Sequence, residues 1–216
     1  MNLVLFGPPG SGKGTQAERL RDGMQLRHIS TGDLLRDAVA KGTELGRTVQ
    51  GILASGQLVS DDLVLALMRD AIVAVGRDGA LKGWLLDGFP RTLGQADGLD
   101  RLLEELGQKI GAIVVLDVRR EAVVERLSGR RTCTQCKAVY HVQANPPAAE
   151  GRCDRCGGTL VQREDDRPET IARRLDVYRA QTQPIIAHYR GRVAIHEIDG
   201  ELPVDEVTRS IERVLK

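Results

Sequence analysis

The chain has 216 residues, of which 41% are hydrophobic and 28% charged, a composition typical of a globular protein with one sizeable core and room for small insertions. Lys and Arg (31) nearly balance Asp and Glu (30), so the net charge is only +1. This balance argues against a general nucleic-acid-binding or membrane-surface protein, and any anion-binding site must be local.

Short apolar runs alternate with longer segments of helical periodicity, the pattern of a parallel sheet covered by helices. The predicted strands are residues 3–6, 27–29, 84–87, 113–117 and 193–198. The predicted helices are residues 13–23, 61–75, 92–106, 120–127, 169–189 and 204–215. We therefore predict an α/β fold with a five-stranded parallel sheet flanked by helices.

Two stretches interrupt this alternation. Residues 30–59 are predicted to form short helices punctuated by glycine, and residues 129–166 a polar, loop-like stretch that contains all four cysteines. We interpret both as insertions into one core, which comprises residues 1–29, 60–128 and 167–216.

The first predicted strand leads directly into residues 7–13, Gly-Pro-Pro-Gly-Ser-Gly-Lys, which fit the G-x-x-x-x-G-K pattern of a phosphate-binding loop. Its glycines let backbone N–H groups point inward at phosphate oxygens, and Lys13 would reach the β- and γ-phosphates. A glycine-rich turn without a ligand is the alternative. Gly14 follows the lysine and the hydroxyl is displaced to Thr15, so Mg²⁺ is expected to rely on water and a carboxylate elsewhere.

The segment 84–91, Trp-Leu-Leu-Asp-Gly-Phe-Pro-Arg, places Asp87 at the C-terminal end of a predicted strand, where open parallel sheets collect their ligands. Asp87 could hold Mg²⁺ through water, and Arg91 offers a planar fork suited to a phosphate. On its own, Asp-Gly is more often a plain turn. The site hypothesis therefore depends on the phosphate loop.

Together, these motifs resemble those of the adenylate kinases, whose phosphate loop has the form Gly-x-Pro-Gly-x-Gly-Lys-Gly-Thr and is paired with Asp-Gly-Phe-Pro-Arg and a glutamine four residues further on. Here these are residues 7–15, 87–91 and Gln95. The resemblance continues in order through residues 30–36, 56–59, 129–131, 139–141, 145–147 and 163–166. It covers essentially the whole chain and implies a P-loop NTPase-type fold.

The resemblance implies a binding site for each nucleotide. The AMP site would comprise Thr31, Arg36, Gln57, Leu58, Val59, Gly88, Phe89, Pro90, Arg91, Gln95, Arg163 and Arg174. The ATP site would comprise Gly10, Ser11, Gly12, Lys13, Gly14, Thr15, Arg126, Arg130, Val139, Tyr140 and Leu202. The catalytic residues would be Lys13, Asp87, Arg91, Arg130, Arg163 and Arg174.

The resemblance also implies roles for single residues and for the two insertions. Gln95 would read the adenine edge of AMP, and residues 30–59 would be the mobile AMP-binding insertion. Asp165 and Asp166 would latch the closed lid, residues 129–166. A single arginine is usually a solvated surface charge. The clustering of these arginines in family order favours the functional interpretation.

The cysteines form two pairs, Cys133/Cys136 and Cys153/Cys156, separated by sixteen residues. This spacing is that of a tetrahedral Cys₄ zinc site. Four thiolates leave no coordination position for water or substrate, so the zinc would be structural. Free thiols or a redox pair are the alternatives.

The implied reaction is Mg²⁺-dependent, reversible transfer of the γ-phosphoryl group of ATP to AMP, giving two ADP, without a protein nucleophile. One alternative is a related kinase that acts on UMP, CMP or GMP or uses GTP as donor; Gln95 and Thr31 argue for AMP. The other is a non-catalytic nucleotide sensor or zinc-ribbon binding module.

We expect ATP, AMP and ADP as the partners, with no nucleic acid and no membrane. The family suggests a monomer, and the absence of a signal-peptide pattern or an apolar span suggests a cytoplasmic location.

Overall fold

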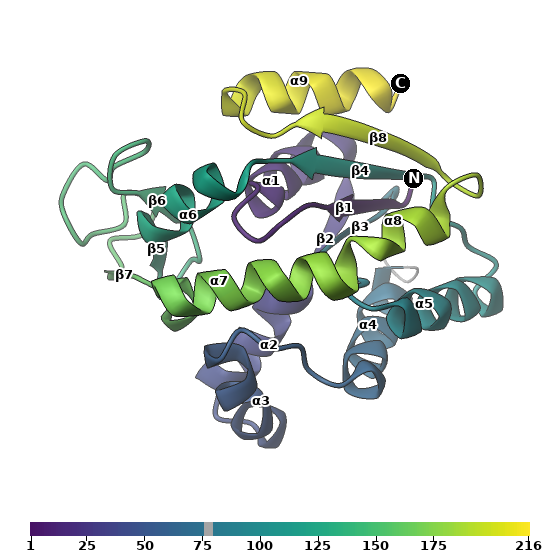
Figure 1. Ribbon diagram of the computed structural model, residues 1–216, viewed down its shortest axis with the longest axis horizontal. Coiled ribbons are helices and arrows are strands. Elements are labelled where there is room, and N and C mark those ends of the chain that lie inside the picture. Colours follow the sequence, from purple (N-terminus) through teal and green to yellow (C-terminus); the bar gives the residue numbers. More distant parts are fainter. Residues whose placement is uncertain (76–79) are drawn as a thin grey trace.

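The computed structural model describes residues 1–75 and 80–216. Within these residues, five parallel strands form a central sheet in the order β2-β3-β1-β4-β8 (Figure 1). They are β1 (Leu3–Phe6), β2 (Leu26–Ser30), β3 (Gly83–Asp87), β4 (Ala112–Asp117) and β8 (Ala194–Asp199). The α/β prediction is confirmed, and each predicted strand end lies within one residue of the observed end.

Side chains alternate between the two faces of the sheet, and both faces are buried. Leu3 and Leu5 of β1 pack with α1 (Lys13–Met24) and α9 (Val204–Val214). Val4 and Phe6 face the other layer, which contains α4 (Asp61–Val75), α5 (Leu93–Glu105) and α8 (Pro184–Tyr189). Figure 1 shows α9 on one side of the sheet and α4, α5 and α8 on the other. Burial of both faces explains why β1, β3 and β4 are largely apolar. The edge strands β2 and β8 also carry polar residues, several of them exposed.

Residues 30–59 contain two capped helices, α2 (Thr31–Ala40) and α3 (Glu44–Ala54). The Ser30 hydroxyl accepts the Asp33 N–H at 3.3 Å, and the Thr43 hydroxyl accepts the Gly46 N–H at 3.0 Å. Both bonds satisfy amides that the first helical turn leaves unpaired. The prediction of short helices in this stretch is confirmed.

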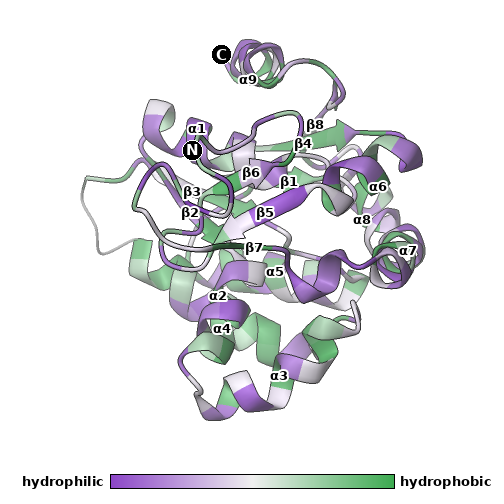
Figure 2. Ribbon diagram, turned by 90° about the vertical axis from the view of Figure 1, so that its left-hand side faces the viewer, coloured by the Kyte–Doolittle hydropathy of each residue, from purple (hydrophilic) through white to green (hydrophobic). Residues whose placement is uncertain are grey.

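Residues 129–166 contain more regular structure than the loop-like prediction allowed. Within the described chain, three short antiparallel strands form a second sheet in the order β6-β5-β7. They are β5 (Arg130–Cys133), β6 (Val139–His141) and β7 (Leu160–Val161). Figure 2 looks onto this sheet and shows the largely hydrophilic β5 in front of the hydrophobic central strands. Strands this short and polar carry too few alternating residues to be predicted from periodicity.

The helix predicted at residues 169–189 is divided in the structure. It consists of α7 (Pro168–Val177), a π-helical turn (Tyr178–Thr182) and α8. The Gln183 N–H donates to the Tyr178 carbonyl at 2.9 Å, a bond that spans five residues. Pro184 has no N–H and its ring crowds the preceding turn, so the α-helical ladder cannot continue through it. α6 (Arg120–Ser128) and α9 agree with their predictions within one residue at each end.

Of the helices in residues 1–75 and 80–216, none is both long and apolar enough to cross a membrane.

Candidate active site

A cleft of about 1110 Å³ lies between the central sheet and the two inserted segments. Its walls include the loop after β1, the residues that follow β3, the helix α2 and the smaller sheet. The volume suits small organic ligands. Most predicted site residues line this cleft: Gly10, Ser11, Gly12, Lys13, Gly14, Thr15, Arg36, Gln57, Leu58, Asp87, Gly88, Pro90, Arg91, Arg126, Arg130, Val139, Tyr140, Arg163, Arg174 and Leu202.

The loop after β1 has the backbone of an anion cradle. Gly7, Gly10 and Gly12 have φ values of 144°, 82° and 96°. Residues other than glycine rarely adopt such positive φ values. A Cβ on Gly7 would lie 2.7 Å from the Leu116 carbonyl oxygen, so the loop packs too closely for a side chain there. These turns lead into the N-terminus of α1, where unpaired N–H groups favour a bound anion.

Lys13 is folded back over this loop. Its Nζ donates to the carbonyl oxygens of Gly7 and Pro8 at 2.7 and 2.8 Å. Burial lowers the pKa of Lys13 to about 8, although the negative charge of Asp87 opposes the shift. The site therefore holds a cation that a bound anion would stabilise.

Asp87 ends β3 at the floor of the cleft. Burial raises its pKa, but the contact with His28 and the charge of Lys13 outweigh burial, so the pKa lies below its usual range. His28 Nε2 lies 3.5 Å from Asp87 Oδ2. A Cβ on Gly14 would lie 3.6 Å from the same oxygen, so the carboxylate faces the start of α1. Asp87 is thus an ionised oxygen donor beside the phosphate loop.

Five of the predicted arginines meet across the cleft, although they come from four distant parts of the chain. They are Arg36, Arg91, Arg130, Arg163 and Arg174. Arg91 Nε donates to the Gly88 carbonyl at 2.7 Å, and Arg163 Nε to the Thr132 hydroxyl at 3.0 Å. Burial, followed by the charge of neighbouring arginines, lowers the pKa of Arg91 to about 10 and that of Arg163 to about 9. Both stay charged at neutral pH, so the cleft is strongly cationic.

Two acidic residues offset part of this charge. Arg130 makes a two-point ion pair with Asp166, with Nε–Oδ2 and Nη2–Oδ1 distances of 2.8 and 2.6 Å. Arg174 Nη1 lies 3.0 Å from Asp166 and 3.1 Å from Asp165. Asp166 is fully buried between the two arginines. The pair orients Arg130 and Arg174 and joins the smaller sheet to α7.

Four predicted AMP residues do not line the cleft and are buried instead: Thr31, Val59, Phe89 and Gln95. The Thr31 hydroxyl donates to the Gly88 carbonyl at 2.7 Å. Gln95 Oε1 accepts the Arg91 N–H at 2.8 Å, and its Nε2 donates to Asp61 at 2.9 Å. These contacts fix the 88–91 segment and the orientation of the Gln95 amide.

The cleft also contains residues that were not predicted. Arg119 follows β4 and makes a two-point contact with Glu201, with Nε–Oε1 and Nη2–Oε2 distances of 2.9 and 2.6 Å. Its position just beyond the C-terminal end of a predicted strand was the available signal. His28, the neighbour of Asp87, lies within β2, and no motif marks it.

The inserted segments touch each other and the core. Lys137 Nζ of the 129–166 segment lies 3.3 Å from Asp37 Oδ1 of α2. Arg155 Nη1, also in the 129–166 segment, lies 3.5 Å from Glu18 Oε2 of α1. Two ion pairs therefore connect the 129–166 segment to the 30–59 segment and to the core.

The four cysteines converge at a second site, and none of them lines the cleft. Their sulfur atoms all lie within 4.8 Å of one another, and the Cys133–Cys156 and Cys136–Cys153 sulfur pairs are 3.5 Å apart. Disulfide bonds would require about 2.05 Å. Four sulfurs bound to one zinc ion at about 2.3 Å would lie roughly 3.8 Å apart. The cluster therefore fits a tetrahedral metal ion.

Comparison with known proteins decides the family. The family model described as adenylate kinase matches residues 5–194. The chain belongs to the adenylate kinase family. It is 47% identical over 216 residues to an adenylate kinase of Syntrophomonas wolfei, covering 100% of this chain and 99% of the relative. Adenylate kinases of Moorella thermoacetica and Archaeoglobus fulgidus are 46% and 45% identical, and each alignment covers 100% of this chain and 98% of the relative.

Membership of the adenylate kinase family confirms the predicted enzyme class, a phosphotransferase that acts on ATP and AMP. Enzymes of this family use ATP with magnesium. The assignment favours an enzyme acting on ATP and AMP over a non-catalytic sensor or a kinase for another monophosphate.

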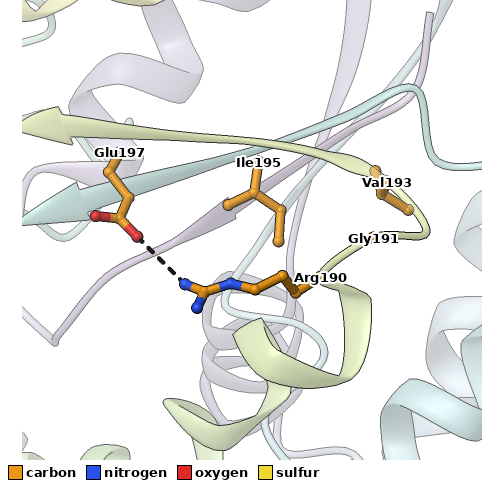
Figure 3. Close-up of a pocket in the computed structure, with 5 residues that line it drawn as sticks. All are labelled: Arg190, Gly191, Val193, Ile195 and Glu197. Carbon is orange, nitrogen blue, oxygen red and sulfur yellow. Dashed lines mark ion pairs between the residues drawn. The ribbon is translucent and has the colours of Figure 1, made fainter.

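A second, smaller hollow of about 380 Å³ lies beside β8 and is lined by Arg190, Gly191, Val193, Ile195 and Glu197 (Figure 3). The Arg190 Nη2 and Glu197 Oε1 atoms are 3.9 Å apart, and both side chains are mostly exposed. A solvated ion pair of this kind contributes little binding energy. The hollow is separate from the nucleotide cleft.

Proposed function

We propose that the cleft performs the reversible transfer of the γ-phosphoryl group of ATP to AMP with the predicted residues in their predicted roles. The observation that supports this most directly is the convergence of Lys13 and five arginines on one cleft beside a phosphate loop. The ATP phosphates would lie in the loop under Lys13. The AMP phosphate would lie against Arg36 and Arg91, with Arg130, Arg163 and Arg174 around the moving group.

The chemistry requires positioning more than a nucleophile. The acceptor is already an anionic phosphate oxygen, and two phosphates that repel each other must be aligned in line. Fixed cations neutralise the charge that spreads over the transferred group. The ion pairs of Asp166 with Arg130 and Arg174 hold two of these cations in place before the substrates bind.

Asp87 is the residue in this cleft that we propose holds the magnesium ion. Its oxygens are the donor type that Mg²⁺ prefers, and the lowered pKa keeps the carboxylate ionised. The ion would neutralise phosphate charge, and Asp87 would hold it through water. Gly14 supplies no hydroxyl and leaves the approach to the carboxylate open.

On the AMP side, we propose that Gln95 reads the adenine edge. Asp61 accepts one Nε2 proton and the Arg91 N–H donates to one Oε1 lone pair, so the second proton and the second lone pair would be offered to the base in a fixed orientation once the buried amide is uncovered. A fixed amide can distinguish adenine from bases with a different edge. Thr31 and residues 57–59 would complete the pocket.

We further propose that residues 30–59 and 129–166 move as bodies against the core and close over the nucleotides. Closure excludes water, which would otherwise compete with AMP as the phosphoryl acceptor. The Lys137–Asp37 contact supports this proposal because it joins the two inserted segments directly. We also propose that the protein is a monomer in the cytoplasm, as the family resemblance and the sequence suggest.

The four cysteines are proposed to bind one structural zinc ion. All four ligand positions would be thiolates, which leaves none for substrate. The buried apolar cluster around them is small, consisting of Cys133, Ala138, Tyr140, Cys153 and Leu160. A cluster of this size supplies little core, so the metal would contribute much of the stability of this segment.

The decisive test of the proposed function is ADP formation from ATP, AMP and Mg²⁺ by the wild type and by Lys13→Met. We expect the variant to lose about 100-fold or more in kcat, because one preorganised charge at the transferred group is removed. Lys109→Met removes an exposed lysine far from the cleft and should leave kcat unchanged. Equal turnover by wild type and Lys13→Met, or faster turnover with UMP, CMP or GMP than with AMP, would contradict the proposal.

The metal proposal predicts one zinc ion per chain after dialysis. A strong chelator should then lower the melting temperature, since the zinc-bound form stabilises the folded segment by linkage. Metal content and thermal unfolding with and without chelator measure this. A protein that contains no zinc and has the same melting temperature with and without chelator would contradict the zinc site.

A further inference from the structure

The Tyr140 hydroxyl lies beside the cysteine cluster, although Tyr140 also lines the cleft in which a nucleotide-binding role was predicted for it. The Tyr140 hydroxyl oxygen is 3.6 Å from Cys153 Sγ, and both side chains are buried in the same small cluster. Only 7% of Tyr140 and 3% of Cys153 is exposed. The inference below rests on the proposed structural metal site.

The direction of this hydrogen bond follows from the other contact of the phenol. The Asp154 N–H donates to the Tyr140 oxygen at 2.9 Å, so that oxygen already acts as an acceptor. The phenol proton is then free to be donated, and Cys153 Sγ is the acceptor in reach. A metal-bound thiolate carries no proton and can only accept, which leaves one possible direction, from Tyr140 to the sulfur.

Hydrogen bonds to metal ligands orient the ligand and adjust its electron donation to the metal. Tyr140 acts on the second cysteine pair in two ways, because it contacts both Cys153 and the backbone of the next residue, Asp154. The turn between Cys153 and Cys156 is thereby tied to β6, which lies between the two pairs in the sequence.

The same strand also faces the nucleotide cleft. Tyr140 pairs with Arg131 in the β5–β6 register, next to the pairing of His141 with Arg130. Val139, the preceding residue in β6, lines the cleft, as does Arg130. One strand thus carries the contact to the cysteine cluster and the contact to the cleft.

We propose that Tyr140 is a positioning residue for the metal centre: its hydroxyl donates a hydrogen bond to the Cys153 thiolate, orients that ligand, and connects the metal centre to the cleft wall through β6. The role belongs to the hydroxyl group, because the ring packs in the apolar cluster whether or not the oxygen is present.

Tyr140→Phe removes the hydroxyl and keeps the ring. We expect zinc affinity, measured by competition with a chromophoric chelator, to fall about 10-fold, the lower end of the effect of outer partners of metal ligands. In the cobalt-substituted protein, the sulfur-to-cobalt charge-transfer band should move to longer wavelength, because a thiolate without its hydrogen bond is a stronger donor. Tyr178→Phe removes a hydroxyl from a tyrosine outside the 129–166 segment and should change neither measurement.

A second measurement covers the case in which Tyr140→Phe folds poorly without metal. Zinc release into excess chelator starts from the zinc-loaded, folded protein, and we expect release to be about 10-fold faster than in the wild type. Equal affinity, equal release and coincident cobalt spectra for wild type and Tyr140→Phe would overturn the role of Tyr140. A wild type that binds no stoichiometric zinc would instead overturn the metal centre itself, so the two failures are distinguishable.

Discussion

Lys13 illustrates how a single residue is prepared for an anionic substrate. Its ammonium group is bonded to two backbone carbonyls of its own loop, and burial lowers its pKa to about 8. The two carbonyl oxygens carry only partial negative charge. A phosphate bound in the loop would supply the full negative charge that Lys13 lacks here. The free enzyme therefore has a cation that titrates near the working pH, whereas the nucleotide complex should hold its proton more firmly.

This pKa predicts an alkaline limb in the pH profile. The charged form of Lys13 is present below pH 8 and is lost above it, so kcat/KM for ATP should be level below pH 8 and fall as the pH rises further. Steady-state rates between pH 6 and 10 would show this. Lys13→Arg keeps a charge at this position, so the profile of its residual activity should stay level past pH 8 and fall only near pH 9, where Arg163 begins to lose its charge. A wild-type profile that is flat to pH 10 would contradict the prediction.

Individual site residues differed in how readily the sequence revealed them. Lys13, Asp87 and Arg91 lie in motifs whose spacing follows from strand, turn and helix geometry. His28 and Arg119 do not, because their partners, Asp87 and Glu201, are brought close only by the pairing of β2 with β3 and by the packing of β8 on β4. A contact between residues so far apart in the chain leaves no local pattern.

At the scale of elements, the close packing of α2 against α3 depends on one glycine. A Cβ on Gly46 would lie 2.1 Å from the Ala38 carbonyl oxygen, a contact that the backbone must move to relieve. Gly51 is on the same helix, is exposed, and has no atom within 4 Å of the position of a Cβ. The two glycines form a matched pair for testing this packing.

We predict opposite effects of alanine at these two positions. Gly46→Ala should lower the free energy of unfolding by about 1–3 kcal/mol, as overpacking does. Gly51→Ala should raise it by up to about 1 kcal/mol, because alanine favours the helix. Thermal or denaturant unfolding measures both. Equal changes in the two variants would show that the α2–α3 contact is looser than the structure indicates.

The strands also show where the apolar pattern of the sequence predicts an element correctly and where it does not. Strands β1, β3 and β4 are buried on both faces, and their apolar runs end sharply at Gly or Asp, so their bounds were predictable. Strand β7 has only two residues, and the small sheet is organised around four cysteines instead of an apolar face. The convergence of the cysteines was predictable from their spacing, whereas the strands between them were not.

Across the whole molecule, two ion pairs connect parts that we propose to move. Lys137–Asp37 joins the two inserted segments, and Arg155–Glu18 joins the 129–166 segment to the core. Lys137 and Arg155 each adjoin a cysteine, Cys136 and Cys156. A metal ion bound by the cysteines would therefore hold the backbone at Lys137 and Arg155 in place. Exposed pairs of this kind are individually weak and sensitive to salt.

A double-mutant cycle on Lys137→Gln and Asp37→Asn tests the first contact. Each single change should raise KM for AMP, by up to about fivefold at low salt, because the closed form loses one attraction. The double variant should resemble the singles, and at about 1 M salt, where screening acts over roughly 3 Å, all four proteins should agree. Additive effects of the two changes would indicate that the residues act independently.

The π-helical turn at Tyr178–Thr182 has a consequence for how the length of this chain can change in evolution. Adding one residue to an α-helix turns everything beyond it by about 100°, which would carry Ile185 and Tyr189 of α8 out of the core they fill. A wide turn absorbs the added residue locally, so that α7 and α8 both keep their apolar faces inward. We therefore expect relatives one residue shorter between α7 and α8 to have a single unbroken helix there, with the same residues facing the sheet.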